Sequence, residues 1–181
     1  MTQKTRRLAR LDWLETGLQA LAETGPSALK AEALARRLKT TKGSFYWHFD
    51  DIPAYHAALL DLWEQRATAA VDSALDTNAS AVGKLRATAQ MVAECGNAMT
   101  GEPAIRAWAR DHAAARATLG RVDAHRLDLI GRLLAEIGIA NPEMARIIYA
   151  TGIGIADLTE DHPGRNVSAM GSLVDLVLAL R

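Results

Sequence analysis

The chain has 181 residues, 49% of them hydrophobic, which is ample for a buried core, and aromatic residues are few, which favours helices over strands. The formal net charge is zero, which excludes a chain that is basic throughout. Cys95 is the single cysteine, which excludes an internal disulfide and a zinc site built from several thiolates. No run approaches the ~18 apolar residues of a membrane span, and the first residues lack the apolar core of a signal peptide, so we expect a soluble, cytoplasmic protein.

Charge is distributed unevenly along the chain. Residues 1–50 contain nine Lys or Arg and five Asp or Glu, a net charge of +4, and the remaining residues carry a net charge of −4. Such an asymmetry indicates an N-terminal surface that faces phosphates, although an excess of four charges also falls within statistical scatter.

Three short helices are predicted in the first fifty residues, because apolar residues recur there at intervals of three and four. Gly25 and Pro26 end the first helix, and Thr41 is the natural side-chain N-cap of the third. We expect these helices at about 8–23, 31–38 and 42–47. They are too short to be stable alone and must pack against the start of a fourth helix.

Six further helices are predicted after residue 50. Pro53 lies in the first turn of the fourth helix, where proline costs no hydrogen bond. The expected helices lie at about 51–75, 80–99, 103–108, 117–137, 142–158 and 167–180. The fold class is therefore all-α, with about nine helices and no strand. We expect two units, 1–53 and 54–181, because the only plausible boundary lies within the fourth helix.

The segment 33–49, which reads ALARRLKTTKGSFYWHF, has the layout of a helix-turn-helix, whose second helix enters the major groove of DNA. Gly43 in this helix allows the backbone to approach DNA closely. Phe45 and Phe49 are expected to face the core and to hold the helix at its angle. Four residues before and between these two phenylalanines have side chains that can contact phosphates or base edges: Lys42, Ser44, Tyr46 and His48.

The same segment resembles the DNA-binding signature of the TetR/AcrR family of transcriptional regulators, and the resemblance extends over about residues 8–63. The matching residues are Leu34 and Ala35, Thr41 to Ser44, Phe45 and Tyr46, and His48 and Phe49. It implies a homodimer that binds a double-stranded DNA operator and responds to a small-molecule effector, with a cavity among helices four to seven and an interface made by helices eight and nine. The DNA-binding residues that it implies are Thr41, Lys42, Gly43, Ser44, Tyr46 and His48.

Three positions depart from the family pattern. Lys39 replaces the usual glycine of the turn, where a left-handed conformation would be strained, so the turn is expected to differ slightly. Lys30 stands where Thr or Ser commonly caps the second helix, and we expect Ser27 to cap it instead. Ile52 replaces the usual phosphate-contacting lysine at the start of the fourth helix.

Several N-terminal residues also have simpler interpretations. The hydroxyl of Tyr46 could point into water, and His48 could cap the C-terminus of its helix. Trp47 is expected in the core or against the fourth helix rather than at a base. Arg36 and Arg37 could be an ordinary solvated face. The remaining basic residues form either a DNA-reaching arm or solubilising charge: Arg6, Arg7 and Arg10.

The C-terminal region contains candidates for an effector pocket and for an ion-pair network. The pocket candidates share positions on facing helices, although core packing is the better interpretation for any one of them: Trp63, Met91, Cys95, Met99, Trp108 and His112. A group of charged residues is expected to form structural salt bridges rather than effector contacts: Arg106, Arg110, Asp111, Asp123 and Arg126. We expect the dimer interface from an apolar face and from small residues that permit close helix approach: Met170, Leu173, Val174 and Val177, with Gly152, Gly154, Ala169 and Gly171.

The sequence does not indicate an enzyme, since it contains no nucleophile elbow, phosphate-binding glycine loop, zinc helix or Cys–His pair, and its five histidines lack metal-ligand spacing. No cofactor is expected. The favoured function is a repressor released from its operator by a small molecule, with the fourth helix as the lever between Tyr55 and Trp63. The alternatives are an activator, and a helical protein-interaction module that has lost DNA binding.

Overall fold

The computed structural model of the chain describes residues 8–75, 80–95, 101–158 and 163–179. All regular secondary structure within these ranges is helical, which confirms the prediction of an all-α fold with nine α-helices. The elements are α1 (Arg10–Thr24), the 3-10 turn η1 (Pro26–Ala28), α2 (Ala31–Arg37), α3 (Lys42–Tyr46), α4 (Ile52–Leu75), α5 (Ala81–Cys95), α6 (Glu102–Ala109), α7 (Ala113–Glu136), α8 (Glu143–Ala156) and α9 (Pro163–Leu178).

Two helices begin earlier than predicted. α7 begins at Ala113 rather than near residue 117, because the imidazole Nδ1 of His112 accepts a hydrogen bond from the Ala115 N–H at 3.2 Å and caps the helix. Side-chain caps are usually Ser, Thr, Asp or Asn, so a histidine cap carries a weak sequence signal. α9 begins at Pro163 rather than near residue 167. Proline has the backbone angle that a first helical turn requires.

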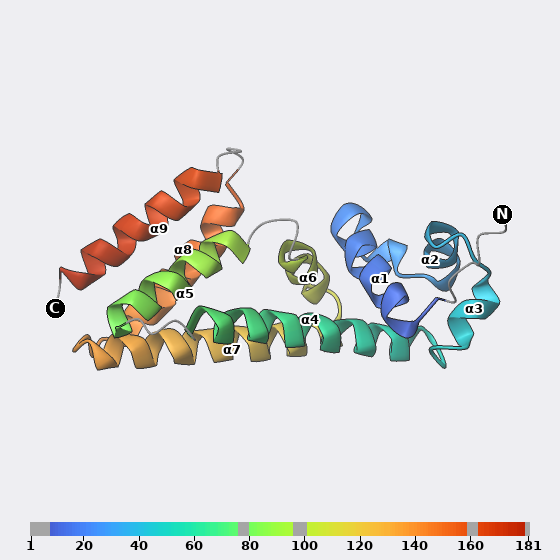
Figure 1. Ribbon diagram of the computed structural model, residues 1–181, viewed down its shortest axis with the longest axis horizontal. Coiled ribbons are helices and arrows are strands. Elements are labelled where there is room, and N and C mark those ends of the chain that lie inside the picture. Colours follow the sequence, from blue (N-terminus) through green and yellow to red (C-terminus); the bar gives the residue numbers. More distant parts are fainter. Residues whose placement is uncertain (1–7, 76–79, 96–100, 159–162, 180–181) are drawn as a thin grey trace, which may run out of the picture.

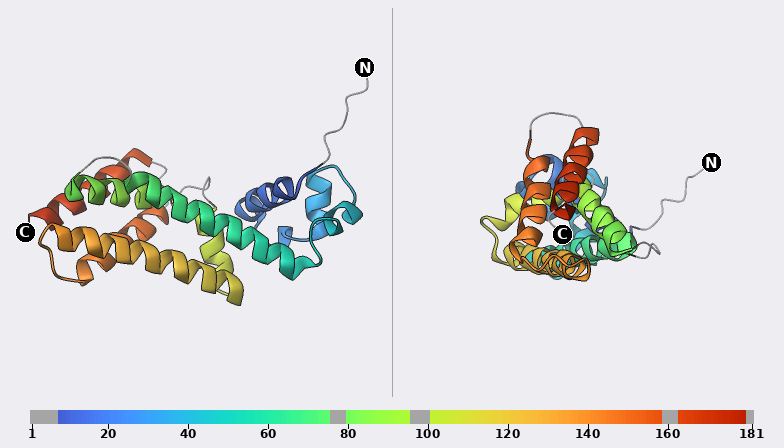
Figure 2. Two further views of the ribbon diagram at one scale, coloured as in Figure 1. Left: turned by 60° about the horizontal axis from the view of Figure 1, so that its bottom comes forward. Right: turned by 90° about the vertical axis from the view of Figure 1, so that its left-hand side faces the viewer.

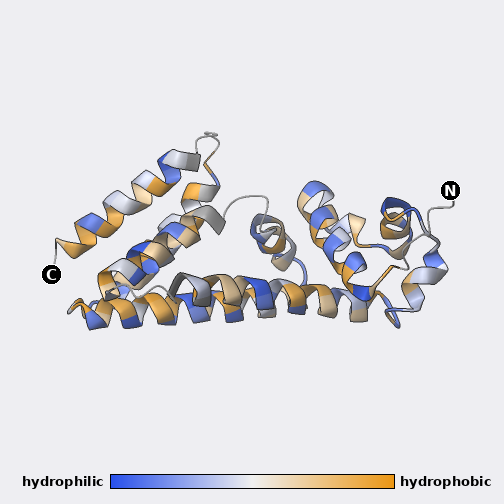
Figure 3. Ribbon diagram, in the orientation of Figure 1, coloured by the Kyte–Doolittle hydropathy of each residue, from blue (hydrophilic) through white to orange (hydrophobic). Residues whose placement is uncertain are grey.

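The helices form an elongated molecule. α4 and α7 pack along each other over much of its length, with α1, α2 and α3 at one end and α5, α8 and α9 at the other (Figure 1). α6 lies between the two ends and packs against α7 and α1. The same arrangement is visible from two further directions (Figure 2). Polar and apolar residues alternate along α4 and α7, as expected for helices with one buried and one exposed face (Figure 3).

The first hydrophobic core joins the N-terminal helices to the rest of the chain. It contains Trp13 of α1 and Phe45 of α3, but also Trp63 of α4, Trp108 of α6 and Val122 of α7. The three N-terminal helices thus bury their apolar faces against elements far along the chain. The boundary between units 1–53 and 54–181 stays a prediction, and the packing across it is extensive.

The second core lies at the other end, among α5, α7, α8 and α9. Met170, Val174 and Val177 of α9 are buried in it, with at most 3% of each residue exposed. Gly152 of α8 permits this packing, since a Cβ atom there would lie 2.3 Å from a Val92 methyl carbon of α5. Most of the apolar face of α9 is therefore used inside the protomer and does not form a free surface, contrary to the expectation from sequence. Among the described residues, no helix combines the length and hydropathy needed to cross a membrane.

α1 rests on α4 at a close contact. The hydroxyl of Tyr55 donates a buried hydrogen bond to the carbonyl oxygen of Trp13 at 3.0 Å. Gly17 makes room for that tyrosine, because a Cβ atom at this glycine would lie 1.8 Å from the hydroxyl oxygen. The two helices can meet this closely only where one of them lacks a side chain.

Candidate nucleic-acid interface

Lys39 sets the turn between α2 and α3. Its φ of 52° lies in the left-handed region, which is strained for a residue with a Cβ atom. The Thr40 N–H donates to the Ala35 carbonyl at 2.9 Å and closes the end of α2. Lys39 thus adopts the left-handed conformation that glycine favours, and the turn carries local strain.

The two helices of the motif differ in how they begin. Thr41 is the N-cap of α3, as predicted, and its hydroxyl accepts a hydrogen bond from the Ser44 N–H at 3.4 Å. Lys30 is the N-cap of α2 and makes no side-chain capping hydrogen bond. Ser27 lies in η1, so the expectation that it caps α2 is wrong. This serine belongs to the 3-10 turn, which ends before α2 begins at Ala31.

Phe45 holds α3 in place. It is fully buried, and its ring centroid lies 5.4 Å from that of Trp13, 5.1 Å from that of Phe49 and 5.2 Å from that of Tyr55. The contacts with Trp13 and Tyr55 are edge-to-face, a geometry that is favourable beyond the area that it buries. The predicted core role of the two phenylalanines is confirmed. A helix of five residues gains its stability from this tertiary anchor rather than from its own hydrogen bonds.

The other side of α3 faces solvent. Tyr46 is 47% exposed, and Lys42 and Gly43 are also exposed. Ser44 and His48 are half-buried, and the His48 ring lies beside Trp13, with 6.5 Å between ring centroids. The predicted DNA-binding residues therefore come together along one short element, with its polar tips outward and the His48 ring partly turned to the core.

Trp47 is the residue of this surface that the sequence interpretation missed. It was expected in the core or against the fourth helix, but it is 84% exposed. Helical spacing contains the signal: Trp47 lies midway between the buried Phe45 and Phe49, about 200° around the axis from the first of them. The exposed indole and the exposed Tyr46 are neighbours in sequence and are both available for contact with a partner. Trp47 therefore joins the candidate interface.

Two basic residues of the motif, Lys42 and Arg37, are engaged in ion pairs. The Nζ of Lys42 lies 2.8 Å from a carboxylate oxygen of Glu32, so the pair joins α3 to α2. The hydrogen bond from this pair raises the pKa of Lys42 and lowers that of Glu32, so both groups stay charged at neutral pH. Arg37 of α2 lies 2.6 Å from Glu23 at the end of α1. Phosphates must therefore compete with carboxylates for Lys42 and Arg37.

Two further positions border this surface. The Arg10 guanidinium lies 5.0 Å from the centroid of the Phe49 ring, a cation–π contact that holds one positive charge close to α3. Arg6 and Arg7 lie outside the described residues. Ile52 packs against the first core, and Asp51 caps α4 by accepting from the Ala54 N–H at 2.7 Å. Ile52 thus contributes to core packing, whereas the lysine of the family pattern would be expected to contact a phosphate.

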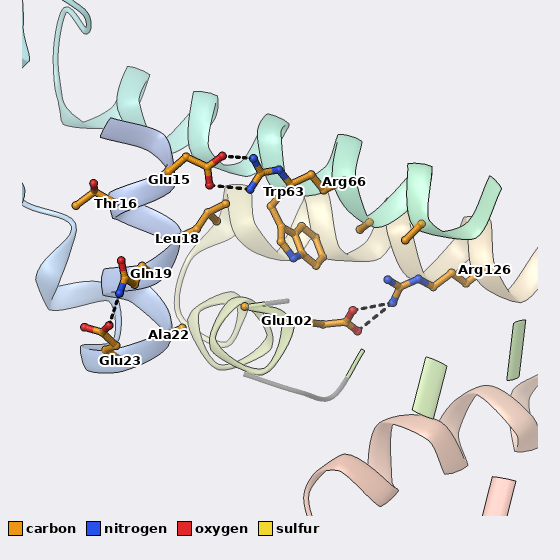
Figure 4. A pocket seen from close by; sticks show the side chains of 13 residues that line it. Glu15, Thr16, Leu18, Gln19, Ala22, Glu23, Trp63, Arg66, Glu102 and Arg126 are labelled. Carbon is orange, nitrogen blue, oxygen red and sulfur yellow. Dashed lines mark hydrogen bonds and ion pairs between the residues drawn. The ribbon is translucent and has the colours of Figure 1, made fainter. Parts of the chain in front are cut away.

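A cavity of about 770 Å³ lies between α1, α4 and the start of α6 (Figure 4). Such a volume suits a drug-sized molecule. The cavity is lined by Glu15, Thr16, Leu18, Gln19, Ala22, Glu23, Trp63, Arg66, Ala67, Ala70, Gly101, Glu102 and Arg126.

The structure places the described members of the predicted pocket in different surroundings. Trp63 lines the cavity. Trp108 and His112 instead stack near His56, with ring centroids 5.0 Å and 5.5 Å from its own. Met91 is half-buried against the second core. Met99, and the side chain of Cys95, lie outside the described residues, so the six residues as a set stay a prediction.

The predicted ion-pair network exists, with partners that the sequence interpretation missed. Arg106 lies 2.8 Å from Glu102 and 2.7 Å from Asp123, and the buried Arg126 lies 2.8 Å from Glu102. The Tyr149 hydroxyl donates to Asp123 at 2.7 Å. Burial opposes the charged forms, but the facing carboxylates raise the pKa of both arginines. The (i, i+4) spacing of Glu102 and Arg106 was the available signal.

Burial of Tyr149 beside this network raises the pKa of its hydroxyl to about 12. Arg110 and Asp111, which were expected in the network, are exposed just beyond α6. Within the part of the chain that the structure describes, no group of three or more His, Cys, Asp or Glu residues could hold a metal ion.

Comparison with known proteins identifies the N-terminal segment. Residues 14–52 match the family model of bacterial regulatory proteins of the tetR family. No curated protein matches the chain.

Similar solved structures extend the likeness to the whole chain. One is a transcriptional regulator from Rhodococcus sp. Rha1, at 15% identity and a TM-score of 0.80, with 95% of this chain and 97% of that chain covered. Another is a TetR-family transcriptional regulator from Streptomyces coelicolor, at 20% identity and a TM-score of 0.73, with 94% and 88% covered. A third is a TetR-like transcriptional regulator from Rhodococcus sp. RHA1, at 17% identity and a TM-score of 0.74, with both chains covered in full. At these identities the likeness is one of fold.

Proposed function

We propose that the protein is a TetR-family regulator, and specifically a dimeric repressor that a small molecule releases from operator DNA; the match of residues 14–52 to the tetR-family model supports this assignment. The similarity of this segment to a family of regulators also supports the prediction that the chain is not an enzyme. One observation carries the proposal: α3 is anchored by the buried Phe45 while Lys42, Tyr46 and Trp47 face solvent.

We assign DNA binding to residues 1–53 and to the exposed side of α3. Lys42 contacts a phosphate or a guanine edge, and Tyr46 contacts a phosphate through its hydroxyl. Trp47 packs on sugar or a thymine methyl group. Gly43 lets the helix approach the backbone. The remaining residues of the proposed set act from the start and the buried flank of α3: Thr41, Ser44 and His48.

The dimer that we propose uses the outer faces of α8 and α9. Three large apolar side chains are exposed there: Ile147 within α8, Leu158 just beyond its C-terminal end, and Leu176 of α9. Gly154 and Gly171 would have no atom within 4 Å of an added Cβ atom, which leaves room for a second copy to approach. Two copies would present two recognition helices to half-sites ~34–36 Å apart.

The cavity beside Trp63 supports release by a small molecule. An effector can open a repressor only if it binds the DNA-free form more tightly than the DNA-bound form. A typical coupling of about 3 kcal/mol weakens DNA binding roughly 150-fold. We assign effector binding and dimerisation to residues 54–181, with a contribution from α1 that is argued below.

The test is a selection of duplexes from a random library by the full-length protein, followed by fluorescence anisotropy. We expect one palindromic duplex to be enriched and its affinity to fall steeply with salt, because phosphate contacts release counterions. A reporter gene placed behind that duplex should be silenced, whereas stimulation would favour an activator. Failure to enrich any duplex over competitor DNA would favour a helical protein-interaction module.

A further inference from the structure

We propose that the cavity between α1, α4 and α6 is the effector site, that it takes an uncharged and largely apolar molecule, and that the molecule acts by moving α1. This rests on the proposed function as an effector-released DNA-binding regulator. The cavity differs in place from a pocket enclosed by helices four to seven, because one of its walls belongs to the DNA-binding domain.

The two walls come from different parts of the chain (Figure 4). Leu18 and Ala22 line the cavity from α1, and Trp63 lines it from α4. Ala70 of α4 also lines it. The inner end is formed by the start of α6, where Glu102 meets Arg126. A molecule in this space would touch the DNA-binding helices and the C-terminal helices at the same time.

The charges around the cavity indicate an uncharged ligand. At the inner end, the buried Arg126 lies 2.8 Å from Glu102, and at the rim Arg66 forms an ion pair with Glu15. Each of these cations faces a carboxylate, so a charged ligand that reached the buried Glu102–Arg126 end would bring an uncompensated charge into a space shielded from water. The indole of Trp63 and the alanine-rich wall of α4 instead favour apolar surface. A hydroxyl or carbonyl group on the ligand could bond to the Glu102–Arg126 pair.

Two contacts explain why α1 would respond. The Glu15–Arg66 ion pair joins α1 to α4 across the rim of the cavity. The Tyr55 hydrogen bond to the Trp13 carbonyl holds the earlier part of α1 firmly on α4. A ligand that pushes the later part of α1 away from α4 would therefore tilt α1 about this contact.

The tilt would reach the recognition helix through α2. Arg37 of α2 lies 2.6 Å from Glu23 and donates to the hydroxyl of Thr24 at 3.1 Å, both at the end of α1. The motion thus passes from α1 to α2 and to α3, which α2 contacts directly. The fourth helix then acts as the fixed wall against which α1 is displaced.

Ligand class and location are tested with two fluorescent probes that share one skeleton. N-phenyl-1-naphthylamine is neutral, and 1-anilinonaphthalene-8-sulfonate adds one negative charge. The neutral probe should bind the wild-type protein at least tenfold more tightly. Ala70→Trp fills the cavity from α4 and Ala22→Trp fills it from α1, and both should abolish binding. The adjacent exposed Ala69 does not line the cavity, so Ala69→Trp should leave binding unchanged.

Equal affinity of the protein for both probes would overturn the proposal that the ligand is uncharged. Unchanged probe binding in both filled variants would overturn the proposal that the ligand binds in this cavity. Circular dichroism at 222 nm confirms that each variant keeps its helices. These measurements need no DNA, so they judge the cavity even if the protein binds no operator.

The motion of α1 is tested with the duplex that the wild-type protein selects. Ala22→Trp and Ala70→Trp should mimic a bound ligand and weaken duplex binding at least tenfold, whereas Ala69→Trp should not. The neutral probe should weaken duplex binding by the wild-type protein only. If the filled variants bind the duplex as tightly as the wild-type protein does, α1 is not the responding element. A wild-type protein that selects no duplex would contradict the proposed function instead.

Discussion

The ammonium group of Lys42 lies 2.8 Å from Glu32, so an ion pair bridges the two helices of the DNA-binding motif on its exposed side. In the free protein this carboxylate holds the cation that we assign to DNA, and beside DNA it would repel phosphates. Glu32→Gln should therefore tighten duplex binding roughly two- to fivefold, as expected for an exposed pair.

Lys42→Ala should weaken binding and lower the slope of log affinity against log salt by about one unit, because one phosphate contact is lost. Lys84→Ala, which removes the same charge from α5, is the matched control. An unchanged slope with lost discrimination between duplexes would instead identify Lys42 as a reader of bases.

Substitutions of Trp47 and Phe45 should affect different properties, the first duplex affinity and the second the free energy of unfolding. Trp47→Ala removes an indole that is 84% exposed, so the free energy of unfolding should change by less than about 0.5 kcal/mol while duplex affinity falls. Phe45→Ala removes a fully buried ring and should cost about 3–5 kcal/mol. Urea unfolding followed by circular dichroism and anisotropy with the selected duplex measure the two effects. Equal affinity of Trp47→Ala and wild-type protein would remove this residue from the interface.

Lys39 offers a gain in stability. Glycine adopts a φ of 52° without strain, but it also makes the unfolded chain more flexible. The difference should leave Lys39→Gly about 0.5–1 kcal/mol more stable than the wild-type protein in urea unfolding. Lys39→Ala removes the same charge but keeps a Cβ atom, so it should show no gain. An equal gain in both variants would assign the effect to charge rather than to backbone strain.

Leu176 tests the dimer. Its side chain is 63% exposed on α9, whereas the neighbouring Val177 is buried in the protomer's own core. Leu176→Asp should shift the protein from dimer to monomer in size-exclusion chromatography with light scattering, since an obligate interface buries roughly 2,000 Å² or more and tolerates no unpaired charge at its centre. Leu11→Asp changes an exposed leucine of α1 and should leave the dimer intact. A wild-type protein that is monomeric at micromolar concentration would defeat the proposed interface.

His56 should make stability fall in mild acid. Burial lowers its pKa from the usual 6.5, the Leu29 carbonyl offsets part of this effect, and the neighbouring His112 adds to it. The unfolded chain then binds a proton more readily than the folded chain, so stability is full above about pH 6.5 and is lost as the pH falls below it. The slope for one proton is at most about 1.4 kcal/mol per pH unit. His56→Phe should flatten the curve between pH 7 and pH 5, and an equally steep curve would contradict this assignment.

Much of the N-terminal domain could be predicted because its signals are local. The cap of α3 by Thr41 depends on residues three apart, and the buried face of Phe45 and Phe49 depends on residues four apart. The strain at Lys39 follows from one position and the turn around it. Such features depend on short stretches of chain, whose geometry the residues themselves largely specify.

The sequence by itself thus determined the all-α class, the helix order and the helix-turn-helix segment. Only the tertiary structure decided how the cavity that we propose as the effector site is built. The Glu15–Arg66 and Glu64–Arg121 pairs join residues more than fifty positions apart, and the apolar face of α9 turned out to pack on α5. Periodicity says which side of a helix is apolar, but the neighbour that covers that side is chosen by the packing of all the helices together.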